Sequence, residues 1–349
     1  MPVSIRVLHA LHGDCILITI GSEEPLKRIL IDGGPPGTFK ARPSGDLRCL
    51  LAELLRQGKY IDLVILTHVD DDHIGGLIKA FEHEDGLAVL AKKVIFNSGR
   101  LIHKYFNVTP DISKEIEGNF TQSQATSIGQ GDTLERLLED KGIWHQEIIK
   151  QGDTYVLDGA ELLFLSPNEK ELNRLLGEWA KEFPIQFTSH KKTDWADSYE
   201  SLISTDTFVE DGSVTNASSL AFILRVDSRS FLFLGDAHPS TVSMGLKLFK
   251  YTVENPLEAE LVKVSHHGSK GNTNSEFLHL VHCSRFVIST DGSRHGLPDK
   301  VTLARIHNHN SDAVIYFNYE GLIDELYSES EQLALGSKIQ AANGELKFA

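Results

Sequence analysis

Short apolar runs alternate with polar turns over the first hundred residues, and this pattern predicts a series of strands. The runs are rich in Ile, Leu and Val, as strands are. The predicted strands cover residues 4–8, 15–20, 28–31, 63–67 and 93–96. Apolar residues recur at helical spacing over residues 47–57, 74–81 and 123–141, which predicts amphipathic helices there. The polar residues 122–127 at the start of the last helix are expected to form a loop over a site.

The second half of the chain repeats this alternation around a polar interruption. A hairpin is predicted at residues 154–165, because Asp158-Gly159 separates two apolar runs. Further strands are expected at the following positions: residues 220–226, 230–234, 259–264 and 285–289, then a hairpin-like stretch over 313–326. Periodicity alone therefore predicts an α/β protein.

Residues 168–215 are polar and too long for a simple loop. We expect helical content in this segment and an insertion that caps the active-site side. The alternative is an excursion without a function, since surface segments vary freely. With 349 residues the chain could hold one or two domains. Because the motifs described below are spread from end to end, a single domain over residues 1–349 with this insertion is the better interpretation.

Composition narrows the class of protein. The formal net charge is −15, so the chain has no overall attraction to nucleic acid or anionic lipid. The three cysteines are far apart and lack Cys-x-x-Cys spacing, which favours a reducing compartment and argues against a cysteine-based zinc site. No run of about 18 apolar residues and no signal-peptide core is present. A cytoplasmic protein without a membrane contact is expected.

The most specific chemical signal follows the apolar run at residues 63–66. Two imidazoles and three carboxylates come within six residues there, at His68, Asp70, Asp71, Asp72 and His73. Ionisable groups at the end of a buried strand are costly unless a cation neutralises them. His and Asp without Cys suit zinc, manganese or iron. The alternative is a solvated acidic turn. We interpret the chain as a metal-dependent hydrolase.

This motif also carries a family resemblance. His68-x-Asp70-x-Asp72-His73 resembles the His-x-His-x-Asp-His signature of the metallo-β-lactamase superfamily, with Asp70 in place of the second His. This variant is similar to the stand-alone form of the soluble hydrolase domain of the competence protein ComEC. Other matching segments follow in chain order: His12-Gly13-Asp14, Ile31-Asp32-Gly33-Gly34, Asn216-Ala217-Ser218-Ser219, Leu234-Gly235-Asp236, Ser265-His266-His267-Gly268-Ser269-Lys270 and Asp291-Gly292-Ser293-Arg294-His295-Gly296. The resemblance implies a four-layer αββα sandwich of two mixed sheets with helices outside.

The resemblance also implies a site with two divalent metal ions. His68 and Asp70 would hold one ion, and Asp72 and His73 would face the other, where Asp72 also counts as catalytic. Asp236 would bridge the two ions. The first choice for the remaining ligand is His295. Zinc or manganese is expected, with magnesium as a further option, because oxygen donors favour harder ions.

Two features of this assignment stay open. If His295 is the ligand, His266 and His267 would bind the phosphate or protonate the leaving oxygen; the reverse assignment, with His267 as the ligand, fits the spacing as well. The superfamily also supplies a further His between the first motif and the bridging Asp. Its candidates are His83, His103, His145 and His190, of which His145 is nearest in spacing. None lies in a convincing context, so the first metal is expected to be weakly held.

Substrate contacts are expected from a few polar residues near the late motifs. Lys270, Arg294 and Lys300 would form a phosphate clamp, with simple solvation as the alternative. Asn216 would donate to the substrate or hold a turn, and His238 would support the metal ligands.

The leading functional prediction is a phosphodiesterase, specifically a nuclease that cleaves DNA or RNA with a metal-activated water. Two alternatives stay open. One is a hydrolase of a small phosphodiester, cyclic nucleotide or lactone. The other is a subunit of a bacterial defence complex that a protein partner activates.

Overall fold

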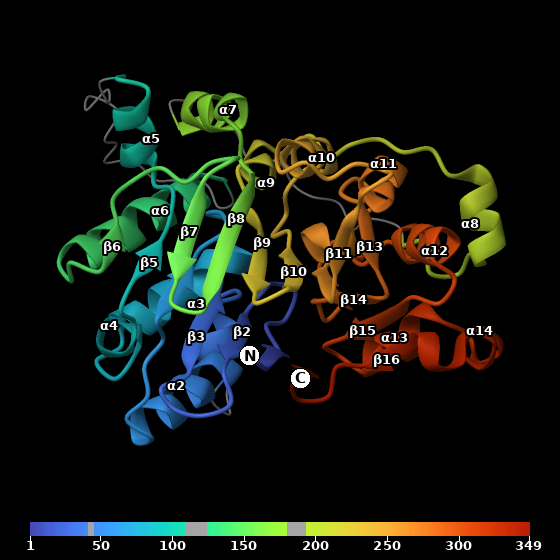
Figure 1. The fold of residues 1–349 in the computed structure, drawn as a ribbon, viewed down its shortest axis with the longest axis horizontal. Coiled ribbons are helices and arrows are strands. Elements are labelled where there is room, and N and C mark those ends of the chain that lie inside the picture. Colours follow the sequence, from blue (N-terminus) through green and yellow to red (C-terminus); the bar gives the residue numbers. More distant parts are fainter. Residues whose placement is uncertain (41–44, 109–123, 180–192) are drawn as a thin grey trace.

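The computed structural model describes residues 1–40, 45–108, 124–179 and 193–349. Its strands form two large sheets that face each other, and helices cover the two outer faces (Figure 1). In each sheet one half is antiparallel and the other half is parallel. Both sheets are therefore mixed, as the resemblance implied.

The first sheet contains strands from both ends of the chain. In spatial order its strands are β17 (Leu346–Phe348), β1 (Val3–Val7), β2 (Ile16–Ile20), β3 (Lys27–Ile31), β4 (Leu63–Ile65), β5 (Val94–Ile95) and β6 (Trp144–His145). Strands β3 to β6 run parallel to one another, so their carboxyl ends lie at one edge of the sandwich.

The second sheet is built from the later part of the chain. In spatial order its strands are β16 (Ile339–Ala341), β15 (Val314–Phe317), β14 (Arg285–Ile288), β12 (Leu261–Lys263), β10 (Arg229–Phe233), β9 (Ala221–Val226), β8 (Ala160–Ser166) and β7 (Thr154–Leu157). A separate two-stranded sheet joins β11 (Leu257–Ala259) to β13 (Val281–Cys283).

The helices divide between the two outer faces and the connecting segments. Those of the first half are α1 (Gly37–Lys40), α2 (Asp46–Arg56), α3 (Asp71–Glu82), α4 (Leu87–Leu90), α5 (Gly99–Tyr105) and α6 (Gln124–Glu139). Those of the second half are α7 (Glu169–Trp179), α8 (Tyr199–Thr205), α9 (Val214–Ala217), α10 (Pro239–Leu248), α11 (Ser275–His279), α12 (Lys300–His309), α13 (Gly321–Leu326) and α14 (Glu329–Leu335). Single 3₁₀ turns occupy Ser265–Gly268 and Gly336–Lys338.

Alternation along the strands produces three layers of apolar core. In β3, Ile29 and Ile31 point between the sheets, where they join side chains such as Phe222 and Phe233. Leu30 points the other way and joins the core beneath the helices of the first half. A third cluster lies between the second sheet and its helices. Because successive strand residues face opposite sides, each sheet is apolar on both faces and is covered on both. The four-layer prediction is confirmed.

Most predicted elements are present, and two differ. Residues 313–326 do not form a hairpin: β15 pairs in parallel with β14 and β16, and the chain then enters α13. Leu322 and Leu326 lie four residues apart and are both buried, which is a helical spacing. The predicted loop over 122–127 is wrong from Gln124 onward, because α6 begins there, and residues 122 and 123 lie outside the described residues.

The described part of the polar insertion at 168–215 contains α7, α8 and the start of α9, joined by non-helical stretches at 193–198 and 206–213. Among the described residues, no helix is both long enough and apolar enough to cross a bilayer.

Candidate metal centre

The polar residues of the first motif lie where β4 gives way to α3. The strand ends at Ile65, residues 66–70 form a loop, and α3 starts at Asp71, so Asp72 and His73 lie in its first turn. The backbone N–H of Leu220 donates to the Thr67 carbonyl and joins this loop to the second sheet. Asp236 follows β10 on that sheet. The two sheets thus bring their strand ends together at one edge.

Asp236 is the group on which the imidazoles converge. Its side chain is almost completely buried. Its Oδ1 lies 3.4 Å from His73 Nε2. Its Oδ2 lies 3.8 Å from Nε2 of each of three other histidines, His68, His266 and His267. Asp72 approaches from α3, with Oδ2 3.5 Å from His267 Nε2. Two ligands of one ion, each roughly 2.1 Å from it, lie about 3–4 Å from each other. The separations between these donor atoms are of that size.

Several of these donor atoms are buried and have no hydrogen-bond partner among the described residues. They are Nε2 of His68, His73 and His267, together with Oδ1 of Asp236. Buried polar atoms are normally paired, so such a group requires an explanation. Among the described residues, three sets of three donors are close enough to share an ion: His68, His73 and Asp236; Asp72, His73 and His267; and Asp14, Asp32 and His73. The unpartnered atoms fit a divalent cation.

The other ring nitrogens determine which tautomer is present. His73 Nδ1 lies 2.8 Å from the Asp32 carboxylate and His267 Nδ1 lies 2.8 Å from the Ser289 carbonyl oxygen. Both partners only accept, so each Nδ1 carries the hydrogen. The Thr67 hydroxyl donates its one hydrogen to Asp32, so it must accept from His68 Nδ1 at 3.1 Å. In their neutral form all three rings therefore direct a lone pair at Nε2 toward the centre.

The pKa shifts of the buried groups agree with a site that binds a cation. Burial opposes protonation of His73, but the carboxylates of Asp236 and Asp32 outweigh burial and raise its pKa well above the usual value. For His267 as well, burial opposes protonation, but the carboxylates of Asp236 and Asp14 outweigh burial and raise the pKa to about 10. Burial raises the pKa of Asp236, yet the surrounding imidazoles hold it well below its usual value. Without a cation, protonated imidazoles therefore balance the charge of these carboxylates, which stay ionised.

A buried ion pair between Lys263 and Asp14 supports the candidate centre. Lys263 on β12 forms an ion pair with Asp14, and both side chains are about 2% exposed. The other carboxylate oxygen of Asp14 lies 3.3 Å from His267 Nδ1. The backbone of Asp14 donates to the Asp72 carbonyl at 3.2 Å. This pair links the loop after β1, the second sheet and the helix that carries Asp72.

The structure brings most predicted ligands together and places one apart. Asp70 Oδ2 lies 3.6 Å from His68 Nε2 and accepts a hydrogen bond from Thr215. His295 is exposed, has a left-handed backbone, and is absent from the candidate ligand groups of the described residues. Partial desolvation of its ring and the charge of Arg294 lower the pKa of His295, and the charge of Asp72 acts in the opposite direction. His295 therefore lies close to Asp72, at the exposed mouth of the site.

Of the residues predicted to contact a phosphate, some are exposed and others are buried. Arg294 and Lys270 are exposed, and Arg294 donates to His12 at 3.1 Å. Lys300 is buried, where it donates to Glu331 and to the Trp195 carbonyl, so the prediction of a phosphate clamp is wrong for this residue. Asn216 is buried and its amide donates to Asp211.

Three of the four histidine candidates for the missing ligand are described, and none of these three is in a candidate ligand group. His145 lies on the edge strand β6, with its ring against Tyr155, and burial lowers its pKa. His83 packs on Phe39 and His103 lies in α5. His190 lies outside the described residues.

Sequence reasoning missed four polar residues that hold the site: Asp14, Asp32, Lys263 and Asp211. Asp14 and Asp32 lie within segments that carried the resemblance, and Lys263 lies within the predicted strand 259–264, so a charged residue in or beside an apolar run was the available signal. Asp211 lies in the polar insertion, where the sequence offers no such signal.

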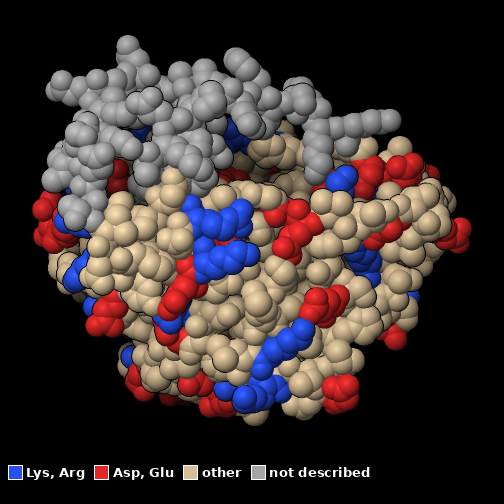
Figure 2. Space-filling model, turned by 90° about the horizontal axis from the view of Figure 1, so that it is seen from above, with Lys and Arg blue, Asp and Glu red and all other residues tan. Residues whose placement is uncertain are grey.

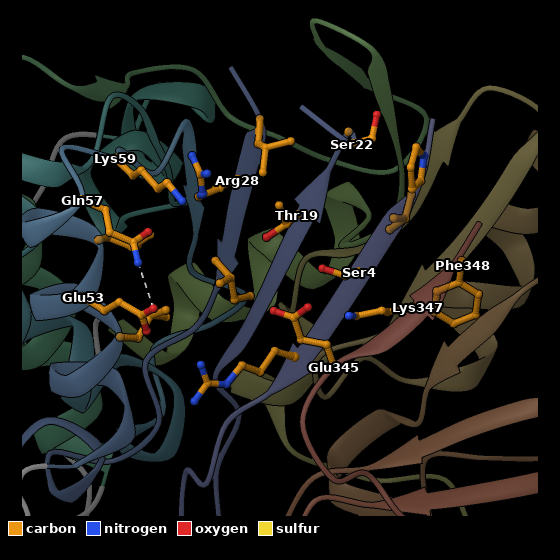
Figure 3. A pocket seen from close by; sticks show the side chains of 18 of the residues that line it. Ser4, Thr19, Ser22, Arg28, Glu53, Gln57, Lys59, Glu345, Lys347 and Phe348 are labelled. Carbon is orange, nitrogen blue, oxygen red and sulfur yellow. Dashed lines mark hydrogen bonds between the residues drawn. The ribbon is translucent and has the colours of Figure 1, made fainter. Parts of the chain in front are cut away.

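The surface outside this centre is mixed in charge. On the described part of the face in Figure 2, Lys and Arg form small groups beside Asp and Glu, without a continuous basic stripe. A hollow of about 570 Å³ lies on the outer face of the first sheet, beside α2 and the end of β17. Figure 3 shows Arg28, Lys59 and Lys347 around it, with Ser4 and Thr19 on its floor. None of the ligand candidates lines this hollow.

Comparisons with known proteins agree with the geometry. Residues 10–146 match the model of the metallo-beta-lactamase superfamily. The chain is 22% identical over 325 residues to ComE operon protein 3 of Bacillus subtilis (strain 168), a match that covers 90% of this chain and 32% of that protein. The chain thus spans about a third of the length of this relative.

Solved structures with a similar course of the chain include two further proteins. The metallo-beta-lactamase fold protein YhfI from Bacillus subtilis aligns with a TM-score of 0.40 and 12% identity, covering 99% of this chain and 98% of that one. A diphosphatase of the PhnP family aligns with a TM-score of 0.40 and 14% identity, covering 100% and 98%.

Proposed function

We propose that the chain, whose residues 10–146 match the model of the metallo-beta-lactamase superfamily, is a metal-dependent hydrolase whose substrate is a phosphodiester, with a DNA or RNA strand as the first choice. The observation that carries this proposal is the convergence of four imidazole nitrogens on Asp236, three of them on rings that can direct a lone pair inward. This donor set suits zinc or manganese, and the carboxylates of Asp70 and Asp72 add the oxygen character that manganese prefers.

We assign the residues as follows. Asp72, His73 and His267 would hold one ion, His68 and Asp70 would hold the other, and Asp236 would face both. The ligand assignment thus favours His267, the alternative that spacing left open, over His295. Bound divalent ions lower the pKa of water and polarise phosphoryl oxygens.

The chain's own residues supply the remaining parts of the reaction. His266 is about one quarter exposed, and its Nε2 faces the centre beside Asp236, where it can contact a phosphoryl or leaving-group oxygen. Arg294 at the mouth can pair with a neighbouring phosphate. His68, His73, His267 and Asp236 are buried, and burial of these candidate ligands limits the access of water to them.

The negative net charge of the chain favours a second candidate within the same chemistry. With a net charge of −15 and small basic groups on the face in Figure 2, a long duplex would gain little from electrostatic attraction. A short strand end or a small phosphodiester needs fewer contacts. A protein partner that supplies nucleic-acid contacts remains the third proposal.

Substrate panels with matched variants test the proposal. The purified chain loaded with manganese or zinc would be assayed on end-labelled single-stranded and duplex oligonucleotides, on bis(p-nitrophenyl) phosphate, and on a lactone and a β-lactam. We expect phosphodiester cleavage that His73→Ala abolishes and that His279→Ala, a surface control, leaves unchanged. Turnover of the lactone or β-lactam without any phosphodiester cleavage would refute the substrate class and leave the metal-dependent hydrolase standing.

A further inference from the structure

Asp211, near the end of the polar insertion, forms a hub beside the candidate centre. Its side chain is 16% exposed. Its Oδ2 accepts from the amides of Asn216 at 2.7 Å and Asn272 at 3.3 Å, and its Oδ1 accepts from the Ser213 N–H at 2.9 Å. Its own N–H donates to the Gly271 carbonyl at 3.1 Å. These contacts fix the carboxylate against the loop that follows the two late histidines.

His266 is the side chain on which this hub acts. Its Nδ1 lies 3.0 Å from Asn272 Oδ1 and 3.4 Å from Asp211 Oδ2, both of which accept. The amide nitrogen of Asn216, which donates to the same Asp211 oxygen, lies 3.3 Å from this Nδ1. With Nδ1 held on this side, the opposite nitrogen, Nε2, faces Asp236 at 3.8 Å. The backbone of His266 is left-handed, with φ 46° and ψ 52°, which is costly for a residue with a Cβ. Such a conformation persists where surrounding contacts determine it.

Asp211 is itself poorly suited to bind a cation. Three N–H donors already point at its two oxygens, and such donors direct positive charge toward any ion placed there. His238 also approaches, with Nε2 3.7 Å from Asp211 Oδ2. The surroundings of the carboxylate are thus two imidazoles, two amides and one backbone N–H, an arrangement that holds side chains in place.

We propose that Asp211 is a positioning residue that fixes the His266 ring so that Nε2 faces the phosphoryl or leaving-group oxygen of the substrate. This inference rests on the proposed function, and it gives the polar insertion a defined task in the reaction. Asp211 acts through His266 and does not contact the substrate. Because the loss of such a supporting contact commonly costs 10–100-fold, we expect an effect of about that size on turnover.

Two variants of Asp211 and one control on the same segment provide the kinetic test. Asp211→Ala removes the hub and Asp211→Asn keeps its shape and part of its accepting capacity. Glu210→Gln removes a neighbouring carboxylate that contacts Ser240 instead of the site. We expect kcat on an alkyl-leaving phosphodiester to fall about 10–100-fold in Asp211→Ala and less in Asp211→Asn, with KM within about two-fold. Nitrophenyl leaving groups should lose less, because they need no help from His266.

A second kinetic result must hold for the same mechanism. In a His266→Ala background, Asp211→Ala should cause little further loss, because the two residues act as one unit. Full additivity, or equal losses for both leaving groups, would overturn the positioning role.

A readout independent of turnover separates this inference from the proposed function. In metal-free protein labelled with ¹⁵N-histidine, Asp211→Ala should shift the His266 Nδ1 signal and broaden the ring signals, whereas Glu210→Gln should leave them in place. An unchanged His266 spectrum in Asp211→Ala refutes positioning. A changed spectrum in a protein that cleaves no phosphodiester supports positioning and refutes the proposed substrate class.

Discussion

His73 Nδ1 lies 2.8 Å from Asp32 Oδ2, and both side chains are fully buried. Asp32 follows β3 in a left-handed conformation, with φ 56°, and it also accepts from the N–H and the hydroxyl of Thr67. One carboxylate thereby orients both histidines of the first motif, His73 directly and His68 through Thr67. The contact between Asp32 and His73 joins segments that follow two neighbouring strands. It therefore orients the candidate ligands in the metal-free protein.

Asp32→Asn is therefore expected to weaken metal binding by about 10–100-fold, the usual effect of losing an outer carboxylate partner. Competition with a chelator of known affinity measures this change. Asp62→Asn is the matched control, since Asp62 is a buried carboxylate on the same sheet that pairs with Lys92 and the Arg28 N–H. If both variants bind metal equally well, Asp32 does not orient the ligands.

His267→Ala is expected to lose bound metal, and His295→Ala is expected to keep it. The Nε2 of His267 is buried and unpartnered beside Asp72, whereas His295 is exposed at the mouth. Elemental analysis of both variants after manganese loading decides the point. Loss of metal from His295→Ala alone would restore the first assignment and leave the fold unchanged.

Lys263→Met is expected to lower the free energy of unfolding of the metal-free protein by about 3–5 kcal/mol, because Asp14 would be left as a buried, uncompensated charge. Lys263→Met with Asp14→Asn should recover part of this loss, since no lone charge then remains. Denaturant titrations of the two variants and of wild type give the values. A single-variant loss under about 1 kcal/mol would show that the pair is not needed for stability.

The metal-free protein should become less stable as the pH rises from about 6.5 to 10. The folded-state pKa of His267 is raised to about 10, above its ordinary value of 6.5, so the protonated form is favoured in the folded state. Its stabilising effect is complete below 6.5 and is lost as the pH passes through the folded-state pKa. Thermal unfolding in a chelator at several pH values measures this trend, and His267→Gln should flatten it over that range. A wild-type curve that rises between pH 7 and 10 would contradict the prediction.

Metal affinity should follow the opposite trend. Ions compete with protons for Nε2 of His73 and His267, whose pKa values are both raised. Apparent affinity should therefore increase with pH over the same interval, and binding should release protons. Calorimetric titrations in buffers of different ionisation enthalpy would detect the released protons, and an affinity independent of pH would exclude this competition.

Periodicity in the sequence predicted an α/β protein, the resemblance to a known family implied the two-sheet sandwich, and the first motif indicated one part of the candidate site. The continuous apolar run at residues 29–31 suits a strand that is covered on both faces, and the polar burst from His68 to His73 is costly without a cation. The prediction of a hairpin-like stretch at residues 313–326 was wrong. Whether an apolar run pairs with the next run in the chain or with more distant strands depends on the whole sheet, and β15 pairs with β14 and β16.

Only the tertiary structure distinguished His267 from His295, and only it found Asp211. Two histidines 28 positions apart look equivalent along the chain, yet one turns inward on a 3₁₀ segment and the other stays at the surface. Asp211 lies in a polar insertion without periodicity, and its role arises from contacts with residues 5, 55 and 61 positions away. Periodicity specifies which face a residue takes, whereas the direction of a single ring depends on hydrogen bonds that form only when distant segments meet.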